Sequence, residues 1–287
     1  MISTQFDYVC ARSLDEALTL LAQNEDAKIL AGGHSLIPAM KLRLAMPSLL
    51  IDIGRIPDLT YIREDGTQVR IGAMTSHYQI ESSELLKNIC PLLPECAGHI
   101  GDVQVRNKGT IGGSVAHSDP AGDWPAAVIA LNAELVVASK NGERSISADD
   151  FFVDLMTTAL RPGEILREIR VNKRSGRTGH AYVKMHHPAS GFAVVGVAAC
   201  ITLDGNAGCQ NASIGITGIA AKAYRATAVE SALNGRALDE RTIAGATAQA
   251  TEGVDVNGDL FASEDYRRHL AVVYAKRAIA IASERAR

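Results

Sequence analysis

Apolar positions near the N-terminus follow first helical and then extended spacing. Between residues 13 and 23 they recur every three or four residues, which predicts a helix. A serine three residues ahead of Glu16 opens this segment, as in a capping box. Two short apolar runs, 28–31 and 49–53, have the length of strands. We therefore expect residues 1–56 to form a small α/β unit.

The middle of the chain alternates apolar runs with turn residues. Segments 61–71 and 134–146 each hold two apolar runs, separated by an Asp-Gly and an Asn-Gly pair. These pairs favour the tight turns of β-hairpins, so each segment is predicted to form one. The other elements expected here are helices near 77–87 and 92–101 and a strand over 165–171.

The last third combines long apolar runs with helical segments. Strands are expected over 180–186, 192–203 and 209–217, and helices over 224–234, 239–251 and 265–284. The polar stretch 172–179 contains glycine and precedes all of them, so it is the best candidate for a domain boundary. The pattern as a whole predicts an α+β protein that ends in a three-stranded antiparallel sheet backed by helices.

Composition narrows the class of protein. The chain has 287 residues, of which 47% are hydrophobic and 21% charged, enough to bury a core in one large or two moderate domains. The net charge of −3 lacks the basic excess that nucleic-acid binding requires. No apolar run approaches about 18 residues, and the N-terminus does not resemble a signal peptide. We expect a cytoplasmic protein without a transmembrane segment.

The five cysteines do not suggest a metal centre in this chain. None belongs to a CxxC pair, whereas iron–sulfur and structural zinc sites use closely spaced thiolates. We expect most of them to be buried as small apolar side chains.

Two glycine segments are the main candidates for chemistry: AGGHS at 31–35 and TIGGS at 110–114. Adjacent glycines let the backbone approach a ligand and adopt positive φ, and successive N–H groups in such turns bind anions. Both segments also end in a serine hydroxyl, and two cradles of this kind would suit a diphosphate. A single Gly-Gly turn is more often only a turn, and neither segment matches the Rossmann or P-loop pattern.

Acidic residues follow the second glycine segment. Asp119 and Asp123 lie in a stretch, 109–125, whose glycines and prolines predict a loop. A carboxylate here suits the ribose hydroxyls of a nucleotide. Two alternatives stay open: a metal site that includes His117, and plain capping of a helix that starts near 124. Taken alone, these residues indicate a dinucleotide-like ligand.

Three longer runs carry a more specific resemblance. They are AGGHSLIPAMKLRLAMPSLLIDI (31–53), QVRNKGTIGGSVAHSDPAGDWPA (104–126) and GEILREIRV (163–171). They resemble the FAD-binding medium subunit of molybdenum hydroxylases, of the carbon monoxide dehydrogenase and xanthine dehydrogenase type. The similarity extends over essentially the whole chain.

The resemblance implies a fold with two domains. Residues 1–176 would form an FAD-binding domain of the p-cresol methylhydroxylase type, with subdomains at about 1–56 and 57–176. Residues 177–287 would form the C-terminal domain of the medium flavoprotein subunit, a three-stranded antiparallel sheet with a helical bundle.

It also implies a set of cofactor-binding residues. Both glycine segments would hold the FAD diphosphate, an aspartate would contact the ribose side, apolar residues would touch the adenine or flavin edge, and a lysine would lie near the cofactor. By match, these residues are Ala31, Gly32, Gly33, His34, Ser35 and Leu36; Thr110, Ile111, Gly112, Gly113 and Ser114; and His117, Asp123, Ile165, Leu166, Lys184 and Phe192.

The implied function is electron transfer by non-covalently bound FAD. Molybdopterin and [2Fe–2S] clusters would belong to a large and a small partner subunit, in a dimer of heterotrimers, and electrons would leave to an external acceptor. No catalytic acid or base and no metal ligand is expected in this chain. A stand-alone flavin oxidoreductase and a non-catalytic scaffold subunit are the alternatives. Ser114, Phe192 and the run Met185-His186-His187 depart from carbon monoxide dehydrogenases, which favours a related hydroxylase with another substrate.

Overall fold

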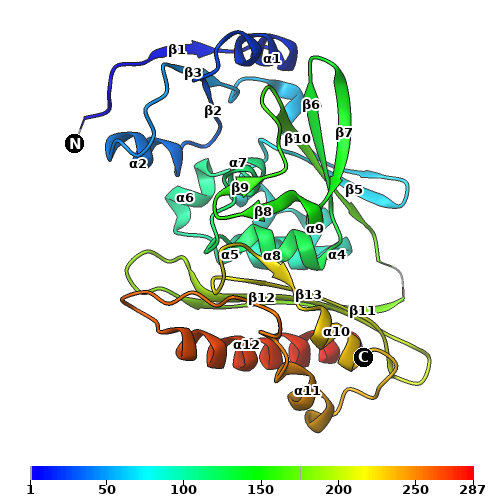
Figure 1. Ribbon diagram of the computed structural model, residues 1–287. Helices are drawn as coiled ribbons and strands as arrows, with labels where there is room; N and C mark the ends of the chain where they lie inside the picture. Colours follow the sequence, from blue (N-terminus) through cyan, green and yellow to red (C-terminus); the bar gives the residue numbers. More distant parts are fainter. Residues whose placement is uncertain (1, 175) are drawn as a thin grey trace.

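The computed structural model describes residues 2–174 and 176–287. Three units follow one another down the molecule in Figure 1. A small α/β unit lies at the top, a sheet with surrounding helices lies in the middle, and a second sheet rests on a long helix at the bottom. Among the described residues, no helix combines the length and apolar character needed to cross a bilayer.

The N-terminal unit is a three-stranded parallel sheet in the order β1-β3-β2. Its elements are β1 (Asp7–Cys10), α1 (Leu14–Gln23), β2 (Lys28–Leu30), α2 (Leu36–Lys41) and β3 (Leu49–Asp52). The predicted helix and both predicted strands are confirmed, whereas β1 and α2 were not anticipated. The capping box is half formed. Ser13 Oγ accepts the N–H of Glu16, but the Glu16 carboxylate accepts from Arg12 rather than from Ser13.

The central unit contains a five-stranded antiparallel sheet in the order β4-β5-β10-β6-β7. Its strands are β4 (Ile62–Asp65), β5 (Gln68–Gly72), β6 (Glu134–Ser139), β7 (Gly142–Ser147) and β10 (Ile165–Asn172), with η1 (Pro57–Leu59) ahead of β4. Both predicted hairpins are present, and β10 joins them at the centre of the sheet.

Helices pack beside this sheet. They are α3 (His77–Glu81), α4 (Glu84–Ile89), α5 (Leu92–Gly98), α6 (Val103–Lys108), α7 (Ile111–His117), α8 (Asp123–Ala130) and α9 (Ala148–Phe151), followed by the short strands β8 (Phe152–Asp154) and β9 (Thr157–Thr158). The helix predicted over 77–87 is broken in two, because the hydroxyl of Ser83 caps a new helix by accepting the N–H of Leu86.

The prediction of a loop over 109–125 is wrong. Most of that stretch is helix α7 and the start of α8. Glycine disfavours helices, which explains the error. Here Thr110 caps α7. Gly112 packs so closely against Ala73 that a Cβ on Gly112 would lie only 2.4 Å from the Cβ of Ala73. Close packing against the end of β5 therefore overrides local propensity.

The C-terminal unit is a four-stranded antiparallel sheet rather than a three-stranded one. Its elements are β11 (Arg177–His186), β12 (Ala193–Leu203), β13 (Cys209–Thr217), β14 (Tyr224–Arg225), α10 (Thr227–Leu233), α11 (Glu240–Thr247) and α12 (Glu264–Arg285). The added strand, β14, has only two residues and occupies the start of the helix predicted over 224–234. A strand of two residues is too short to show the alternation of apolar and polar positions by which a strand is recognised in a sequence.

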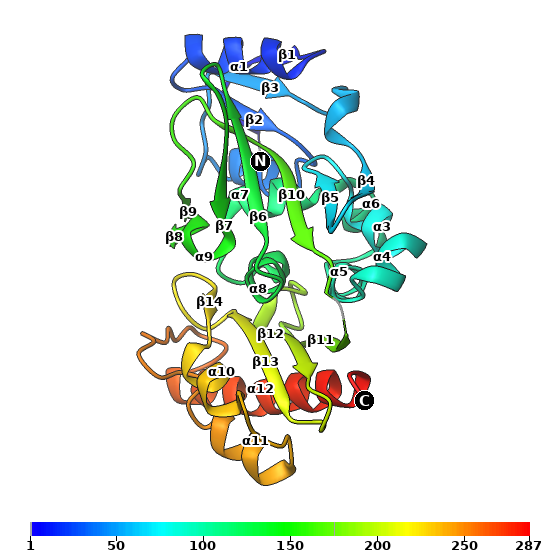
Figure 2. The ribbon, with the colours of Figure 1, turned by 90° about the vertical axis from the view of Figure 1, so that its right-hand side faces the viewer.

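The C-terminal sheet is buried on both faces. Helix α12 covers one face, and α8 of the central unit covers the other, as the turned view in Figure 2 shows. This explains why the longest apolar run of the chain becomes β12. Strand β13 packs very closely against α8, since a Cβ on Gly215 would lie 2.1 Å from the carbonyl oxygen of Ala126.

One hydrophobic core joins the central and C-terminal units. Trp124 of α8 and Tyr182 of β11 belong to the same buried cluster. Arg225 adds polar contacts across this boundary, with hydrogen bonds to the carbonyl oxygen of Ile129 and to Asn132, both 2.6 Å. The central sheet ends at Asn172 and the C-terminal sheet begins at Arg177. The boundary near residue 176 stays a prediction.

Candidate cofactor site

The fold packs the first glycine segment against the second and against the two residues ahead of it. A Cβ on Gly32 would lie 2.3 Å from the carbonyl oxygen of Lys108 and 2.8 Å from the Cα of Gly109. A Cβ on Gly113 would lie 3.4 Å from the Cβ of Ala31. Segments that are almost eighty residues apart thus form one surface, beside α2 and α7 (Figure 1).

The first segment presents unused hydrogen-bond donors. Gly33 has φ +78°, a left-handed conformation that favours glycine. The N–H groups of Gly33, His34, Ser35 and Leu36 donate to no atom of residues 2–174 or 176–287. The Ser35 side chain makes no capping bond to α2. Successive free N–H groups around a left-handed residue form a concavity that binds anions.

The second segment has the same glycine pair but no free N–H groups over 111–114. The N–H of Ile111 donates to Thr75 O (3.0 Å) and that of Gly112 to Ala73 O (2.9 Å). The N–H of Gly113 donates to Thr110 Oγ1 (3.1 Å), and that of Ser114 to Thr110 O (3.0 Å). Gly112 and Gly113 have no positive φ. These four N–H groups are therefore engaged within the protein, at a capped helix start beside the first segment. The predicted contact of residues 110–114 with the FAD diphosphate stays a prediction.

Asp123 and Lys184 meet in a buried pair at the boundary between the central and C-terminal units. Lys184 Nζ lies 2.9 Å from the Asp123 carboxylate, and the lysine side chain has no exposed surface. Tyr182 donates its hydroxyl to Asp123 at 2.5 Å, and Lys184 also donates to the carbonyl oxygen of His99 at 3.0 Å. Burial raises the pKa of Asp123, while the lysine and the two hydrogen bonds oppose that shift.

These contacts satisfy the Asp123 carboxylate with partners inside the protein. Both carboxylate oxygens are engaged, and the residue is 5% exposed. The pair links α8 to β11, so it fastens the C-terminal sheet to the central unit. The predicted ribose contact of Asp123 and the predicted cofactor contact of Lys184 remain predictions.

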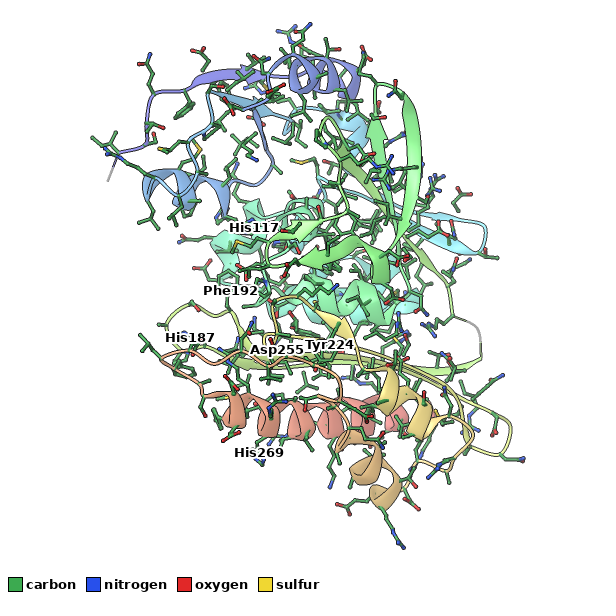
Figure 3. All side chains as sticks on the ribbon, viewed as in Figure 1. His117, His187, Phe192, Tyr224, Asp255 and His269 are labelled. Carbon is green, nitrogen blue, oxygen red and sulfur yellow. The ribbon has the colours of Figure 1, made fainter. Side chains whose placement is uncertain are left out.

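The other predicted site residues divide into buried and accessible ones. Ile165 and Leu166 are 3% and 5% exposed and lie in hydrophobic cores, which is a structural role. Phe192 is 44% exposed, and His117 at the end of α7 is partly accessible. Figure 3 shows Phe192 near the level where the central unit meets the C-terminal sheet, and His117 above it on the same side of the view. Their predicted contacts with the cofactor stay predictions.

Sequence reasoning missed two histidine contacts close to this site. The Nδ1 atom of His99 lies 3.3 Å from Nε2 of His186. Burial lowers the pKa of His99, and the nearby His186 lowers it further. His77 of α3 accepts a hydrogen bond from the indole of Trp124 at 3.1 Å. Only tertiary contacts reveal either pair, because the partners lie 87 and 47 positions apart.

Comparison with known families covers nearly the whole chain. Residues 4–173 match the family described as the FAD binding domain in molybdopterin dehydrogenase, and residues 180–282 match the CO dehydrogenase flavoprotein C-terminal domain. The chain belongs to the FAD-binding medium subunits of the molybdenum hydroxylase family. This confirms the predicted resemblance, the α+β fold with its FAD-binding domain, the oxidoreductase class and FAD as the cofactor.

Individual relatives agree along their full length. The carbon monoxide dehydrogenase medium chain of Hydrogenophaga pseudoflava is 41% identical, with 97% of each chain covered. The glyceraldehyde dehydrogenase medium chain of Sulfolobus acidocaldarius is 36% identical over 97% of this chain and 98% of that one. A solved carbon monoxide dehydrogenase from Hydrogenophaga pseudoflava superposes with a TM-score of 0.96, at 42% identity over 99% of both chains.

The residues of this medium subunit fit the FAD of the family. The diphosphate of FAD is an anion, and the free N–H groups of residues 33–36 form the kind of concavity that holds one. The backbone contact at Gly32 keeps that concavity against the helix start at residues 110–114.

Proposed function

We propose that this chain carries non-covalently bound FAD and transfers electrons within a molybdenum-containing hydroxylase. The observation that supports it most is the row of N–H groups at 33–36 that no described residue uses, directly after Gly32, which packs against the backbone ahead of Thr110. When bound, FAD supplies the redox chemistry: electrons arrive from [2Fe–2S] clusters of a partner subunit and leave to an external acceptor.

The chain's own residues bind and position the cofactor. Residues 33–36 donate to the diphosphate, and Ser35 adds a hydroxyl. Helix α7 and its Thr110 cap hold that segment in place. The Asp123–Lys184 pair keeps the C-terminal sheet against α8, and in the proposal the exposed Phe192 ahead of β12 contacts the cofactor. No residue of this chain acts as a general acid or base in the proposal.

The partners in the proposal are a large molybdopterin subunit and a small [2Fe–2S] subunit, assembled as a dimer of heterotrimers. Relatives support a multi-subunit enzyme by their names, such as the 6-hydroxypseudooxynicotine dehydrogenase complex subunit alpha of Paenarthrobacter nicotinovorans, which is 37% identical. Relatives named for carbon monoxide, glyceraldehyde and a hydroxylated alkaloid share this one fold. This supports placing substrate specificity in the large subunit.

Reconstitution tests the proposal. The full chain, produced alone, is expected to show a flavin absorption spectrum and to release FAD into the supernatant on acid precipitation. Mixed with the large and small subunits of its complex, it is expected to assemble into an enzyme in which organic substrate reduces the flavin. Omission of the large subunit should abolish that reduction.

Two other outcomes would support the alternatives. Substrate oxidation by the isolated chain, free of molybdenum and iron, would make it a stand-alone flavin oxidoreductase. A chain that assembles with the partners but binds no flavin at any FAD concentration would be a scaffold subunit.

A further inference from the structure

His77 presents an unused donor beside the glycine segments. The residue is 4% exposed, yet its Nε2 atom makes no hydrogen bond to any described residue. His180 also has an Nε2 atom without a hydrogen-bond partner among the described residues, but that atom is fully enclosed by protein. The Nε2 atom of His77 therefore reaches the protein surface from an otherwise buried ring.

The hydrogen bond from Trp124 determines which ring nitrogen of His77 carries the proton. An indole N–H can only donate, so Nδ1 of His77 accepts at 3.1 Å and holds no proton. In a neutral ring the proton is then on Nε2. Burial lowers the pKa of His77 to about 4, and the nearby His34 and Arg106 lower it as well, so the ring is neutral at physiological pH.

The position of this N–H relates it to the candidate cofactor site. The Nε2 and Cδ2 atoms of His77 lie 2.6 and 2.8 Å from where a Cβ on Gly109 would be. The Cα of Gly109 is the same atom that Gly32 packs against. The backbone N–H of His77 donates to the carbonyl oxygen of Gly109, which fixes the ring over this glycine. The imidazole and Gly32, the residue directly ahead of the free N–H groups, therefore pack against the same Lys108–Gly109 backbone.

We propose that His77 donates its Nε2–H to an oxygen of the FAD diphosphate and is a cofactor-binding residue contributed by α3. Trp124 is then a positioning residue, because it selects the tautomer that can donate. The proposal deepens the proposed function and rests on FAD binding at 31–36. It explains why a nearly buried histidine keeps one nitrogen unpaired beside the segment that binds an anion.

Two substitutions separate the two ring nitrogens. His77→Gln keeps a donor near the position of Nε2 but loses the acceptor for Trp124. His77→Asn keeps an acceptor near Nδ1 but loses the outward donor. With the full chain, we expect His77→Asn to weaken FAD binding by about tenfold to a hundredfold, and His77→Gln to weaken it less. Thermal stability is expected to fall more in His77→Gln, the reverse order.

A merely structural His77 would give FAD affinities that follow the stabilities, and that result would overturn the proposal. Wild-type affinity in His77→Asn would overturn it as well. FAD affinity is measured by quenching of flavin fluorescence on addition to the apo-chain.

Nitrogen-15 NMR of the wild-type chain provides a test without substitution. The Nε2–H resonance of His77 is expected to shift when FAD is added, and also when ADP is added, since ADP has the diphosphate without the flavin. A resonance that FAD leaves unmoved overturns the role of His77 while FAD binding itself stands. A resonance moved by FAD but not by saturating ADP overturns the diphosphate assignment. A folded chain that binds no FAD overturns both this proposal and the proposed function.

Discussion

The two glycine segments have nearly the same composition and opposite hydrogen-bonding states. Residues 33–36 leave four N–H groups free, whereas residues 111–114 have every N–H engaged by Thr75, Ala73 or Thr110. The first segment keeps donors that no described residue uses, and the second is a helix start packed against the end of β5. A Gly-Gly pair thus permits close backbone packing in both places, at Gly32 against Lys108 and at Gly112 against Ala73, but only the first segment keeps N–H groups available.

The contrast extends beyond residue 114, because the carboxylate of Asp123 is also satisfied internally. Asp123→Ala is the strongest way to test this. Removing the carboxylate leaves Lys184 buried without its partner, which costs about 3–5 kcal/mol of unfolding free energy. Urea unfolding measures the loss. The double variant Asp123→Leu/Lys184→Met serves as the control and should recover much of it, since no buried charge remains. Lost FAD affinity at unchanged stability would instead support the ribose contact.

Acid should destabilise the protein through two buried histidines. Burial lowers the pKa of His77 and of His180 to about 4, so both rings are neutral in the folded protein. The unfolded chain takes up these protons below about pH 6.5. The free energy of unfolding is therefore highest above that pH and declines between about pH 6.5 and about pH 4. Each of the two histidines accounts for a loss of about 3 kcal/mol over this range.

Unfolding in urea across this pH range measures the decline. The His77→Asn variant is the control, since it removes one titrating group and should reduce the slope. An equal slope in the variant and the wild type would show that His77 does not contribute.

Gly33→Ala tests the first segment. An alanine at φ +78° is strained by roughly 1–2 kcal/mol, and its Cβ would lie 3.2 Å from Cγ1 of Ile37. Relief of that strain would redirect the free N–H groups, so FAD affinity should fall by about tenfold or more. Gly66→Ala is a matched control: it has φ +57° and open space around it, in the β4–β5 turn. It should lose similar stability and bind FAD normally. Equal FAD affinity in the two variants would remove residues 33–36 from the site.

The smallest expected effects come from the two hydroxyl groups. Thr110→Ala removes the cap on Gly113, which should lower the unfolding free energy by about 1 kcal/mol and leave FAD affinity per folded molecule unchanged. Ser35→Ala removes a hydroxyl that caps nothing, so stability should stay the same while FAD affinity falls by about three- to tenfold. Calorimetry measures the stability of both variants, and flavin titration measures their FAD affinity. Lower FAD affinity in Thr110→Ala and lower stability in Ser35→Ala would show instead that the second segment binds the cofactor and the first is structural.

Much of the fold follows from local sequence. The Asp-Gly and Asn-Gly pairs predict both hairpins of the central sheet, because few other residues adopt the required turns. The apolar run of β12 is long and uninterrupted, as expected of a strand covered on both faces. Helix α7 could not be predicted in this way. Its two glycines argue against a helix, and the reason for Gly112 is the close packing of Ala73, almost forty residues earlier.

For the site, the sequence by itself determined the family, the cofactor and the two segments that matter, since these depend on runs of residues that can be read in order. Only the tertiary structure decided which segment keeps free donors. A backbone N–H is free or engaged according to its neighbours in space, and Thr75 and Ala73 reach residues 111 and 112 from the end of another strand. The pairing of Asp123 with Lys184 and of His77 with Trp124 has the same origin. Each joins residues 47 or more positions apart, whose approach is set by the packing of α3, α8 and β11 rather than by any local pattern.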